Sequence, residues 1–189
     1  ADFVMVFAVT DKELVEKRRG GITCFYVPTD TPGYKFESVL KILGQIGGDE
    51  GILSFTNVRI PDRYRVGAVG EGFKVAMFAL ENGRYPVASG ATGLVRACRD
   101  ASVAYAQTRK TFGVPIGEHQ LVKEMIAQMV SDYDASRLLW LRAGWLKNEG
   151  RRNTRETSLA KWFATVASER AAADAVQIHG ANGYSDEYP

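Results

Sequence analysis

The chain has 189 residues, 46% of them hydrophobic, which is enough apolar material for one good-sized domain or two small ones. Its 24 Lys and Arg nearly balance its 22 Asp and Glu, so the formal charge of +2 gives no reason to expect nucleic acid or an anionic membrane as a partner. No run of about 18 apolar residues occurs, and we therefore expect no membrane span.

The first third of the chain, residues 1–66, is predicted to be β-structure. Short β-branched and aromatic runs alternate with turn-forming segments such as the charged Lys12–Arg19 and the glycine-rich Gly44–Gly51. The predicted strands cover residues 3–9, 22–27, 34–43 and 52–58. With no helix expected between them, they favour an antiparallel sheet that curls toward a small barrel.

The remainder is predicted to form three long helices. Apolar residues recur at helical spacing over residues 72–108, 118–148 and 153–180. Pro86 is expected to kink or break the first helix, and Gly150 to cap the end of the second. Asn153 and Glu156 have the spacing of a capping box at the start of the third.

These elements predict an α+β fold, with an antiparallel β-barrel-like domain portion in residues 1–66 and an up-down α-helical bundle in residues 67–189. The chain begins inside an apolar run without an initiator Met and stops abruptly at Pro189, so we expect it to be part of a longer protein, with the bundle truncated at its C-terminus. Cys24 and Cys98 are expected to be free thiols of a reducing compartment.

Common nucleotide, metal and hydrolase motifs are absent from the sequence. The glycines of residues 67–72 follow the order G-x-x-G-x-G, which is neither the dinucleotide fingerprint nor a P-loop, and this segment is expected to be a flexible link from sheet to helix. His119 and His179 have no Cys or carboxylate at zinc spacing, so no metal site is expected. No serine lies in a G-x-S-x-G elbow.

The segment Arg109–Gly113 follows the first predicted helix and has two interpretations. The structural one is a cationic helix C-terminus with a glycine stop. The functional one is that Arg109 is a fixed cation for phosphate oxygens and Thr111 a hydroxyl donor beside it, with Phe112 as an apolar wall for a planar ring.

The segment Gln177–Tyr184 at the end of the third helix is equally ambiguous. Its glycines, Gly180 and Gly183, are typical of a helix cap and turn, but they also remove side chains, so that a diphosphate or ribose can approach the backbone. Gln177 needs a hydrogen-bond partner if it is buried.

Taken together, the order and spacing of these segments resemble the acyl-CoA dehydrogenase family over almost the whole chain. Four motifs carry the resemblance: a central β-domain stretch with Leu43-Gly44-Gln45, Asp49, Phe55 and Val58–Pro61; the helix opening Gly70–Lys74; Arg109–Gly113 with His119-Gln120; and Gln177–Gly183. Residues 1–66 would then belong to the middle β-domain and residues 67–189 to the C-terminal helical domain.

The resemblance implies FAD as the cofactor, bound at a subunit interface of a homodimer or homotetramer. The residues expected to reach the FAD of a neighbouring subunit are Arg109, Lys110, Thr111, Phe112, His119, Gln120, Gln177, Ile178, His179, Gly180 and Ala181. It also implies that an acyl-CoA thioester is oxidised to a 2-enoyl-CoA, with electrons passed to an electron-transferring flavoprotein.

The catalytic base of the family, a Glu that removes the α-proton, is expected beyond Pro189, so the chain alone should be inactive. In the minority of the family that carries the base on the first C-terminal helix, the matching position here is Gly83, which cannot act as a base. Glu81 and Arg84 match positions facing the CoA part of the substrate, although Glu81 is equally well explained as a solvated helix residue. Segments near Arg84 and Lys161 resemble most the glutaryl-CoA dehydrogenase-like branch, while straight-chain, branched and alicyclic substrates stay open.

Two alternatives compete with this hypothesis. One is an acyl-CoA oxidase-like flavoenzyme, which gives its electrons to oxygen. The other is a cofactor-free helical interaction module, since each motif has a capping explanation. A dehydrogenase of this family would act in the cytoplasm of a bacterium or archaeon, or in a mitochondrial matrix.

Overall fold

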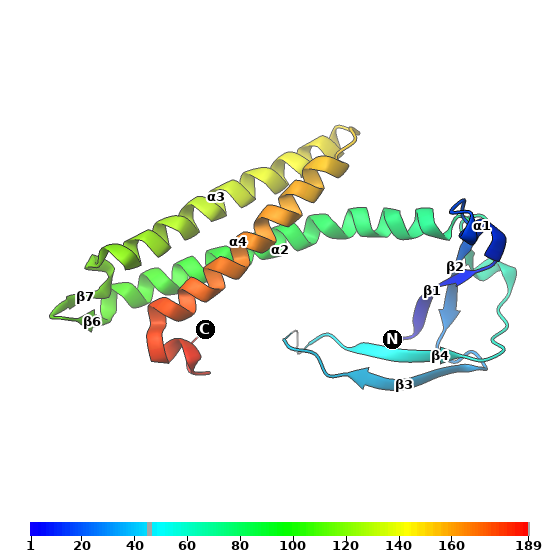
Figure 1. The fold of residues 1–189 in the computed structure, drawn as a ribbon, viewed down its shortest axis with the longest axis horizontal. Helices are drawn as coiled ribbons and strands as arrows, with labels where there is room; N and C mark the ends of the chain where they lie inside the picture. The colour runs from blue at the N-terminus through cyan, green and yellow to red at the C-terminus, as the bar shows by residue number, and fades with distance from the viewer. Residues whose placement is uncertain (45–46, 189) are drawn as a thin grey trace. The chain divides into compact units, whose positions relative to one another are not determined.

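The computed structural model describes residues 1–44 and 47–188, so Gln45 of the β-domain motif lies outside the described residues. The chain divides into two compact units, Ala1–Ala79 and Leu80–Pro189, and each is described by itself. The predicted α+β class is confirmed: antiparallel strands fill the first unit, and helices fill the second (Figure 1).

The first unit contains two antiparallel sheets. In one, β1 (Phe3–Val9) pairs along its whole length with β2 (Ile22–Pro28), and the short β5 (Arg65–Val66) pairs with the other edge of β2. The second sheet is a hairpin of β3 (Tyr34–Leu40) and β4 (Glu50–Phe55), with a bulge between Phe36 and Ser38. Within the described residues these two sheets form no closed barrel. The sequence predicted only a barrel-like portion of a domain, and the antiparallel sheets are consistent with that prediction.

One helix of this unit was not predicted from the sequence. The charged segment after β1 forms α1 (Lys12–Glu16), because the Asp11 carboxylate accepts a hydrogen bond from the Leu14 backbone N–H at 3.0 Å and caps the helix. A 3-10 turn, η1 (Asp62–Tyr64), also precedes β5. The expectation that no helix lies between the strands was therefore wrong.

The glycine-rich segment before the first long helix is a packed junction, and the expected flexible link was wrong. The Gly70 N–H donates to the buried Thr23 hydroxyl at 3.0 Å. Gly72 begins α2 so close to β2 that an added Cβ would lie 2.8 Å from the Ile22 carbonyl oxygen and 2.9 Å from the Cys24 nitrogen. Only glycine fits there, because the neighbouring atoms belong to backbone that cannot rotate away.

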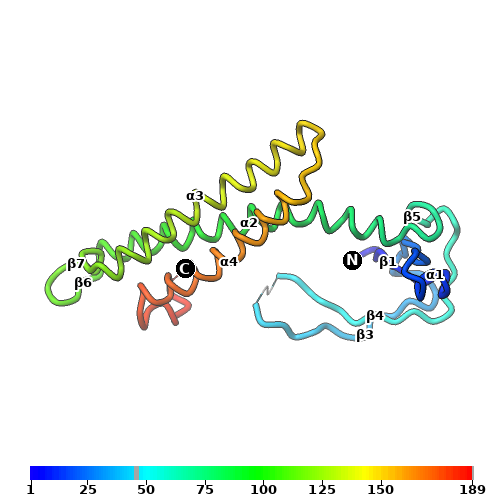
Figure 2. Tube along the Cα trace, turned by 45° about the horizontal axis from the view of Figure 1, so that its top comes forward, coloured from blue at the N-terminus to red at the C-terminus, as the bar shows by residue number. Residues whose placement is uncertain are grey.

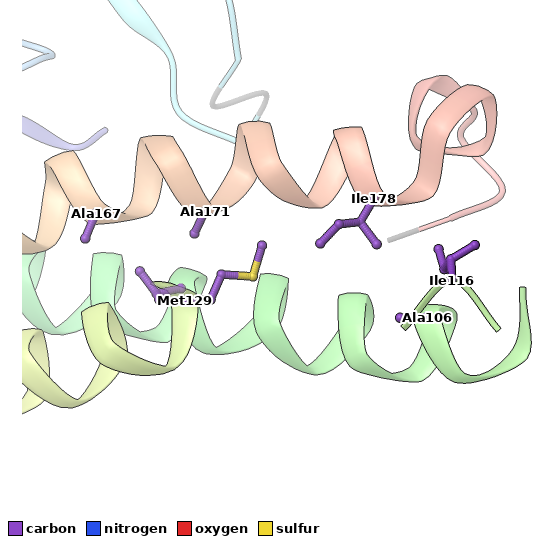
Figure 3. Packing of buried hydrophobic residues seen from close by; sticks show 7 residues of the cluster. Ala106, Ile116, Met129, Ala167, Ala171 and Ile178 are labelled. Atoms are coloured by element: carbon purple, nitrogen blue, oxygen red, sulfur yellow. The ribbon is translucent and has the colours of Figure 1, made fainter. Parts of the chain in front are cut away.

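The second unit is built on α3 (Gln120–Asn148), α4 (Thr154–His179) and residues 80–108 of α2 (Gly72–Thr108). Helices α3 and α4 run antiparallel, side by side (Figures 1 and 2). The larger of two clusters of buried apolar residues lies among these helices (Figure 3): Val95, Ala106, Ile116, Met129, Ala167, Ala171 and Ile178. The second cluster, Ala88, Ala160 and Ala164, joins α2 to α4. Small residues on α4 allow close approach of the helices, and the larger Met129 fills the remaining space.

The ends of the helices agree with the sequence within a few residues, but two local details differ. Pro86 does not interrupt α2, which runs as one helix through it. Asn153 takes the N-cap position of α4, but its side chain donates to the Ala143 carbonyl at 3.1 Å and does not form the predicted capping box. The Gly150 cap is confirmed, with a φ of +66° and an Arg151 N–H bond to the Leu146 carbonyl at 2.9 Å.

Candidate functional site

The segment after α2 is a small β-hairpin rather than a helix stop. Strands β6 (Lys110–Thr111) and β7 (Val114–Pro115) pair, and Phe112 and Gly113 form the tip with φ of +52° and +86°. Positive φ at both central positions is the requirement of a two-residue type I′ turn. The structural interpretation of this segment as a glycine-terminated helix was therefore wrong.

Arg109 is fixed at the base of this hairpin by its main chain. Its N–H donates to the Tyr105 carbonyl at 2.9 Å, and its own carbonyl accepts from the Ile116 N–H at 2.8 Å. The side chains of Arg109 and Lys110 are exposed. The hairpin thus presents two cations at a defined place directly after α2.

Thr111 and His119 form a polar pair next to the hairpin. The Thr111 hydroxyl oxygen lies 2.9 Å from His119 Nε2. The Phe112 ring, 97% exposed, meets the His119 ring edge to face at 6.1 Å. The 3-10 turn η2 (Ile116–Glu118) carries the chain to His119, the N-cap of α3, and the exposed Gln120 is the first residue of that helix.

The second predicted segment, Gln177–Tyr184, lies at the end of α4 and in the turn that follows it. Ile178 and His179 are buried, whereas Gln177 and Ala181 are exposed. The His179 Nδ1 lies 2.8 Å from the Ala175 carbonyl oxygen, and because a carbonyl only accepts, Nδ1 carries the proton. Gly180 has a φ of +60° and turns the chain into the 3-10 segment η3 (Gly180–Tyr184).

These two segments, far apart in the sequence, line the same pockets. The smaller pocket, about 200 Å³, is lined by Arg109 together with His179, Gly180 and Ala181. The larger pocket, about 540 Å³, is lined by residues from both segments: Thr111, His119, Gln177 and Ile178. Thr111, Ile116 and Ile178 line both pockets, so the two are neighbours. The predicted Lys110, Phe112 and Gln120 line neither of them.

The residues present suit a phosphorylated ligand. A guanidinium, a hydroxyl, an imidazole and a carboxamide offer hydrogen-bond donors around the two pockets. A Cβ added at Gly180 would meet nothing within 4 Å, so the backbone at this turn is open to a ligand. Among the described residues, no group of three His, Cys, Asp or Glu side chains could hold a metal ion.

Glu81 and Arg84, the predicted substrate residues, lie together near the start of α4. The Thr154 hydroxyl donates to a Glu81 carboxylate oxygen at 3.0 Å, and an Arg84 guanidinium nitrogen donates to the Ser158 hydroxyl at 3.4 Å. With a rise of about 1.5 Å per residue, Arg84 is roughly 36 Å along α2 from the end of this helix at Thr108. The two sets of predicted residues thus occupy opposite ends of this part of α2.

The sequence matches the family model described as "Acyl-CoA dehydrogenase, C-terminal domain" over residues 70–189. The chain belongs to the acyl-CoA dehydrogenase family. It is 38% identical to the probable acyl-CoA dehydrogenase YngJ of Bacillus subtilis (strain 168), over 98% of this chain and 48% of that protein. It is 37% identical to the glutaryl-CoA dehydrogenase of Desulfococcus multivorans, over 100% of this chain and 48% of that protein.

Solved structures agree with this assignment. The structure of butyryl-CoA dehydrogenase from Megasphaera elsdenii matches with a TM-score of 0.93 and 35% identity, over 100% of this chain and 49% of that chain. The chain spans about half the length of the acyl-CoA dehydrogenases that it matches. Within its described part, no helix combines the length and the apolar content that crossing a membrane requires.

Sequence reasoning missed two features of this acyl-CoA dehydrogenase bundle. Tyr105 also lines the smaller pocket and contacts Asn182 of the predicted Gln177–Gly183 motif. Asp132, 3% exposed, accepts hydrogen bonds from Arg170 at 2.6 Å and from Gln128 at 3.0 Å, which joins α3 to α4. The only signal for Tyr105 was its place one helical turn before Arg109, whereas the Asp132 pair joins positions 38 residues apart and had no local signal.

Proposed function

We propose that the full-length protein is an FAD-dependent dehydrogenase that oxidises an acyl-CoA thioester to a 2-enoyl-CoA. The observation that carries this proposal is the smaller pocket, where the cation Arg109 and the open turn at Gly180 meet. Membership of the acyl-CoA dehydrogenase family supports the same reaction. The division into a middle β-domain (1–66) and a C-terminal helical domain (67–189) is part of this proposal.

The two pockets would hold the FAD. Arg109 and the backbone of the Gly180–Ala181 turn suit the diphosphate, because a fixed cation and bare backbone groups bind phosphate oxygens without a steric barrier. Thr111, His119 and Gln177 supply further polar groups, with Ile178 beside them, from the adjoining pocket. Lys110, Phe112 and Gln120, which line neither pocket, would approach the same ligand from its open side.

The FAD held here would belong to a neighbouring subunit, in a homodimer or homotetramer. The support is the separation of about 36 Å along α2 between Arg84, proposed to face the CoA moiety, and the end of the helix beside Arg109. Reacting atoms must approach to about 3–3.5 Å, so substrate and flavin share one site. An interface would let each end of the bundle serve a different active site.

Bound FAD would accept the β-hydrogen of the acyl chain as a hydride. The α-proton would be removed by a glutamate outside these 189 residues. Gly83 has no side chain and cannot be the base, and Glu81 matches a position that faces the CoA part of the substrate. Glu81 and Arg84 would instead orient the CoA part of the substrate, and the chain alone would be inactive.

A glutaryl-CoA-like substrate is the first candidate, because the sequence near Arg84 resembles that branch and a glutaryl-CoA dehydrogenase is among the relatives. Electrons would pass to an electron-transferring flavoprotein. The reaction would take place in the cytoplasm of a bacterium or archaeon, or in a mitochondrial matrix.

The test is to purify the full-length protein and record its absorption spectrum, then to add glutaryl-CoA and butyryl-CoA without oxygen. Oxidised flavin that is bleached by an acyl-CoA supports the proposal. A colourless protein that ignores added FAD overturns it and favours the cofactor-free interaction module. Fast reoxidation by air with release of peroxide would favour the oxidase instead.

A further inference from the structure

Tyr105 connects the two segments that line the smaller pocket. Its backbone carbonyl accepts the Arg109 N–H at 2.9 Å, which fixes the start of the hairpin. Its hydroxyl accepts a hydrogen bond from the Asn182 side-chain amide at 2.9 Å, which fixes the turn after α4. One residue therefore holds both the cation and the glycine turn in place.

The Tyr105 ring also orients His179. The two rings stack with centroids 4.3 Å apart and an interplanar angle of 25°. His179 is 7% exposed and is held on its other side by the hydrogen bond from Nδ1 to the Ala175 carbonyl. Since His179 directly precedes Gly180, the stacked pair sets where the chain leaves the helix.

A second tyrosine closes this cluster. The Asn182 amide donates its second hydrogen to the Tyr188 hydroxyl at 3.2 Å, and the Tyr188 ring meets the Tyr105 ring at a right angle, 5.8 Å between centroids. Both hydrogens of the Asn182 amide are thus used, so its orientation is fixed by the two hydroxyls.

We propose that Tyr105 is a positioning residue for FAD binding, acting through Asn182 and His179 on the turn at Gly180 and through its main chain on Arg109. This inference rests on the proposed function, because it assigns the smaller pocket to the FAD diphosphate. A preorganised turn binds its ligand more tightly because less conformational freedom is lost on binding.

The test uses the full-length protein, stripped of flavin and titrated with FAD. Tyr105→Phe keeps the stacked ring but removes the acceptor for Asn182, and the FAD dissociation constant is expected to rise roughly 2- to 12-fold. Asn182→Ala removes the same hydrogen bond from the other side. Because both variants break one shared bond, the double variant should bind FAD about as weakly as the weaker single variant.

Tyr133→Phe is the matched control. Tyr133 is a partly buried tyrosine of α3 that packs on the core and faces Arg99 but lines neither pocket. Its substitution should leave the FAD dissociation constant unchanged. The unfolding temperature of each flavin-free variant is measured in parallel. If Tyr105 had a purely structural role, its substitution would lower the unfolding temperature, but the FAD affinity measured well below that temperature would not change.

An unchanged FAD dissociation constant in Tyr105→Phe would overturn the inference while leaving the proposed function intact. If the fold-increases in the FAD dissociation constant of the two single variants multiply in the double variant, Tyr105 does not act through Asn182. If the wild-type protein binds no FAD, the proposed function itself fails, so the two failures are distinguishable.

Discussion

Arg109 has a fixed backbone and an unconstrained head group. Hydrogen bonds to Tyr105 and from Ile116 hold its main chain, while its side chain is exposed and makes no ion pair within the described part of the chain. A cation placed in this way contributes little to folding and is available to an anionic ligand.

We therefore expect Arg109→Ala in the full-length protein to weaken FAD binding by about 1.5–3 kcal/mol, roughly 10- to 150-fold, because a charge-assisted contact is lost. The dissociation constant can be measured by titrating flavin-free protein with FAD. Arg137→Ala is the control, since Arg137 is an exposed arginine of α3 that lines neither pocket. Equal FAD affinity in the two variants would contradict the role of Arg109.

Both cysteines are expected to react slowly in the native protein. Cys24 and Cys98 are free, and burial raises the pKa of each thiol. At neutral pH the reactive thiolate is therefore scarcer than in an unfolded chain. Alkylation by iodoacetamide, followed by mass spectrometry, should be slower in native than in urea-unfolded protein, and a native Cys98 that reacts at the unfolded rate would contradict this.

The same shift has a consequence for stability. Because the folded pKa of each thiol is raised, the unfolded chain releases its protons first when the pH increases. The contribution of the thiols to stability is complete below the ordinary thiol pKa of 9.0 and is lost as the pH rises through the folded value.

At the scale of the elements, a largely buried carboxylate on α3 forms an ion pair with Arg170 of α4. The Asp132 side chain is 5% exposed and the Arg170 side chain 47% exposed. We expect Asp132→Ala to lower the free energy of unfolding by about 2 kcal/mol, below the roughly 3–5 kcal/mol of a fully buried pair because Arg170 stays partly in water.

Urea unfolding followed by circular dichroism measures this change. Asp100→Ala is the control, because the exposed Asp100 pairs with Arg96 and Arg99 of α2 in water, where an ion pair adds little to stability. Equal losses in both variants would show that burial of Asp132 adds nothing.

The long helices could be predicted from the sequence because their signals are local. Apolar periodicity and Gly150 mark the ends of α2 and α3 within two residues. The predictions that were wrong concern details that depend on contacts between residues distant in the sequence. Asn153 bonds Ala143 instead of its own helix, and the segment at Gly70 packs on Thr23.

In the candidate site too, the residue types could be predicted from the sequence, but their spatial arrangement could not. Its two segments have recognisable residue types, so Arg109 and Gly180 could be named from the sequence. Their meeting in one pocket, and the part that Tyr105 plays in it, depend on how α2 and α4 pack, which no local pattern encodes.

At the scale of the molecule, both units leave large apolar side chains exposed. Every second residue of β1 is apolar and more than 40% exposed, and Leu138, Trp145 and Trp162 are more than half exposed on the helices. Large exposed apolar side chains of this kind promote association in water where they gather into patches.

We expect the 189-residue segment, expressed alone, to self-associate at micromolar concentration and to bind an apolar dye, whereas the full-length protein forms a defined oligomer. Light scattering and dye fluorescence, compared between the two proteins, measure this difference. A monodisperse segment that does not bind the dye would contradict it.

Phe112, at the tip of the hairpin, is not the residue that would stabilise this turn most. Phe112 has a φ of +52°, where a side chain with a Cβ costs about 1–2 kcal/mol and asparagine is better tolerated. A library selected for thermostability alone would therefore enrich Phe112→Asn and lose the exposed aromatic ring at the tip of the turn. Because Phe112 is proposed to approach the FAD, directed evolution for heat resistance without selection for bound flavin is expected to weaken cofactor retention.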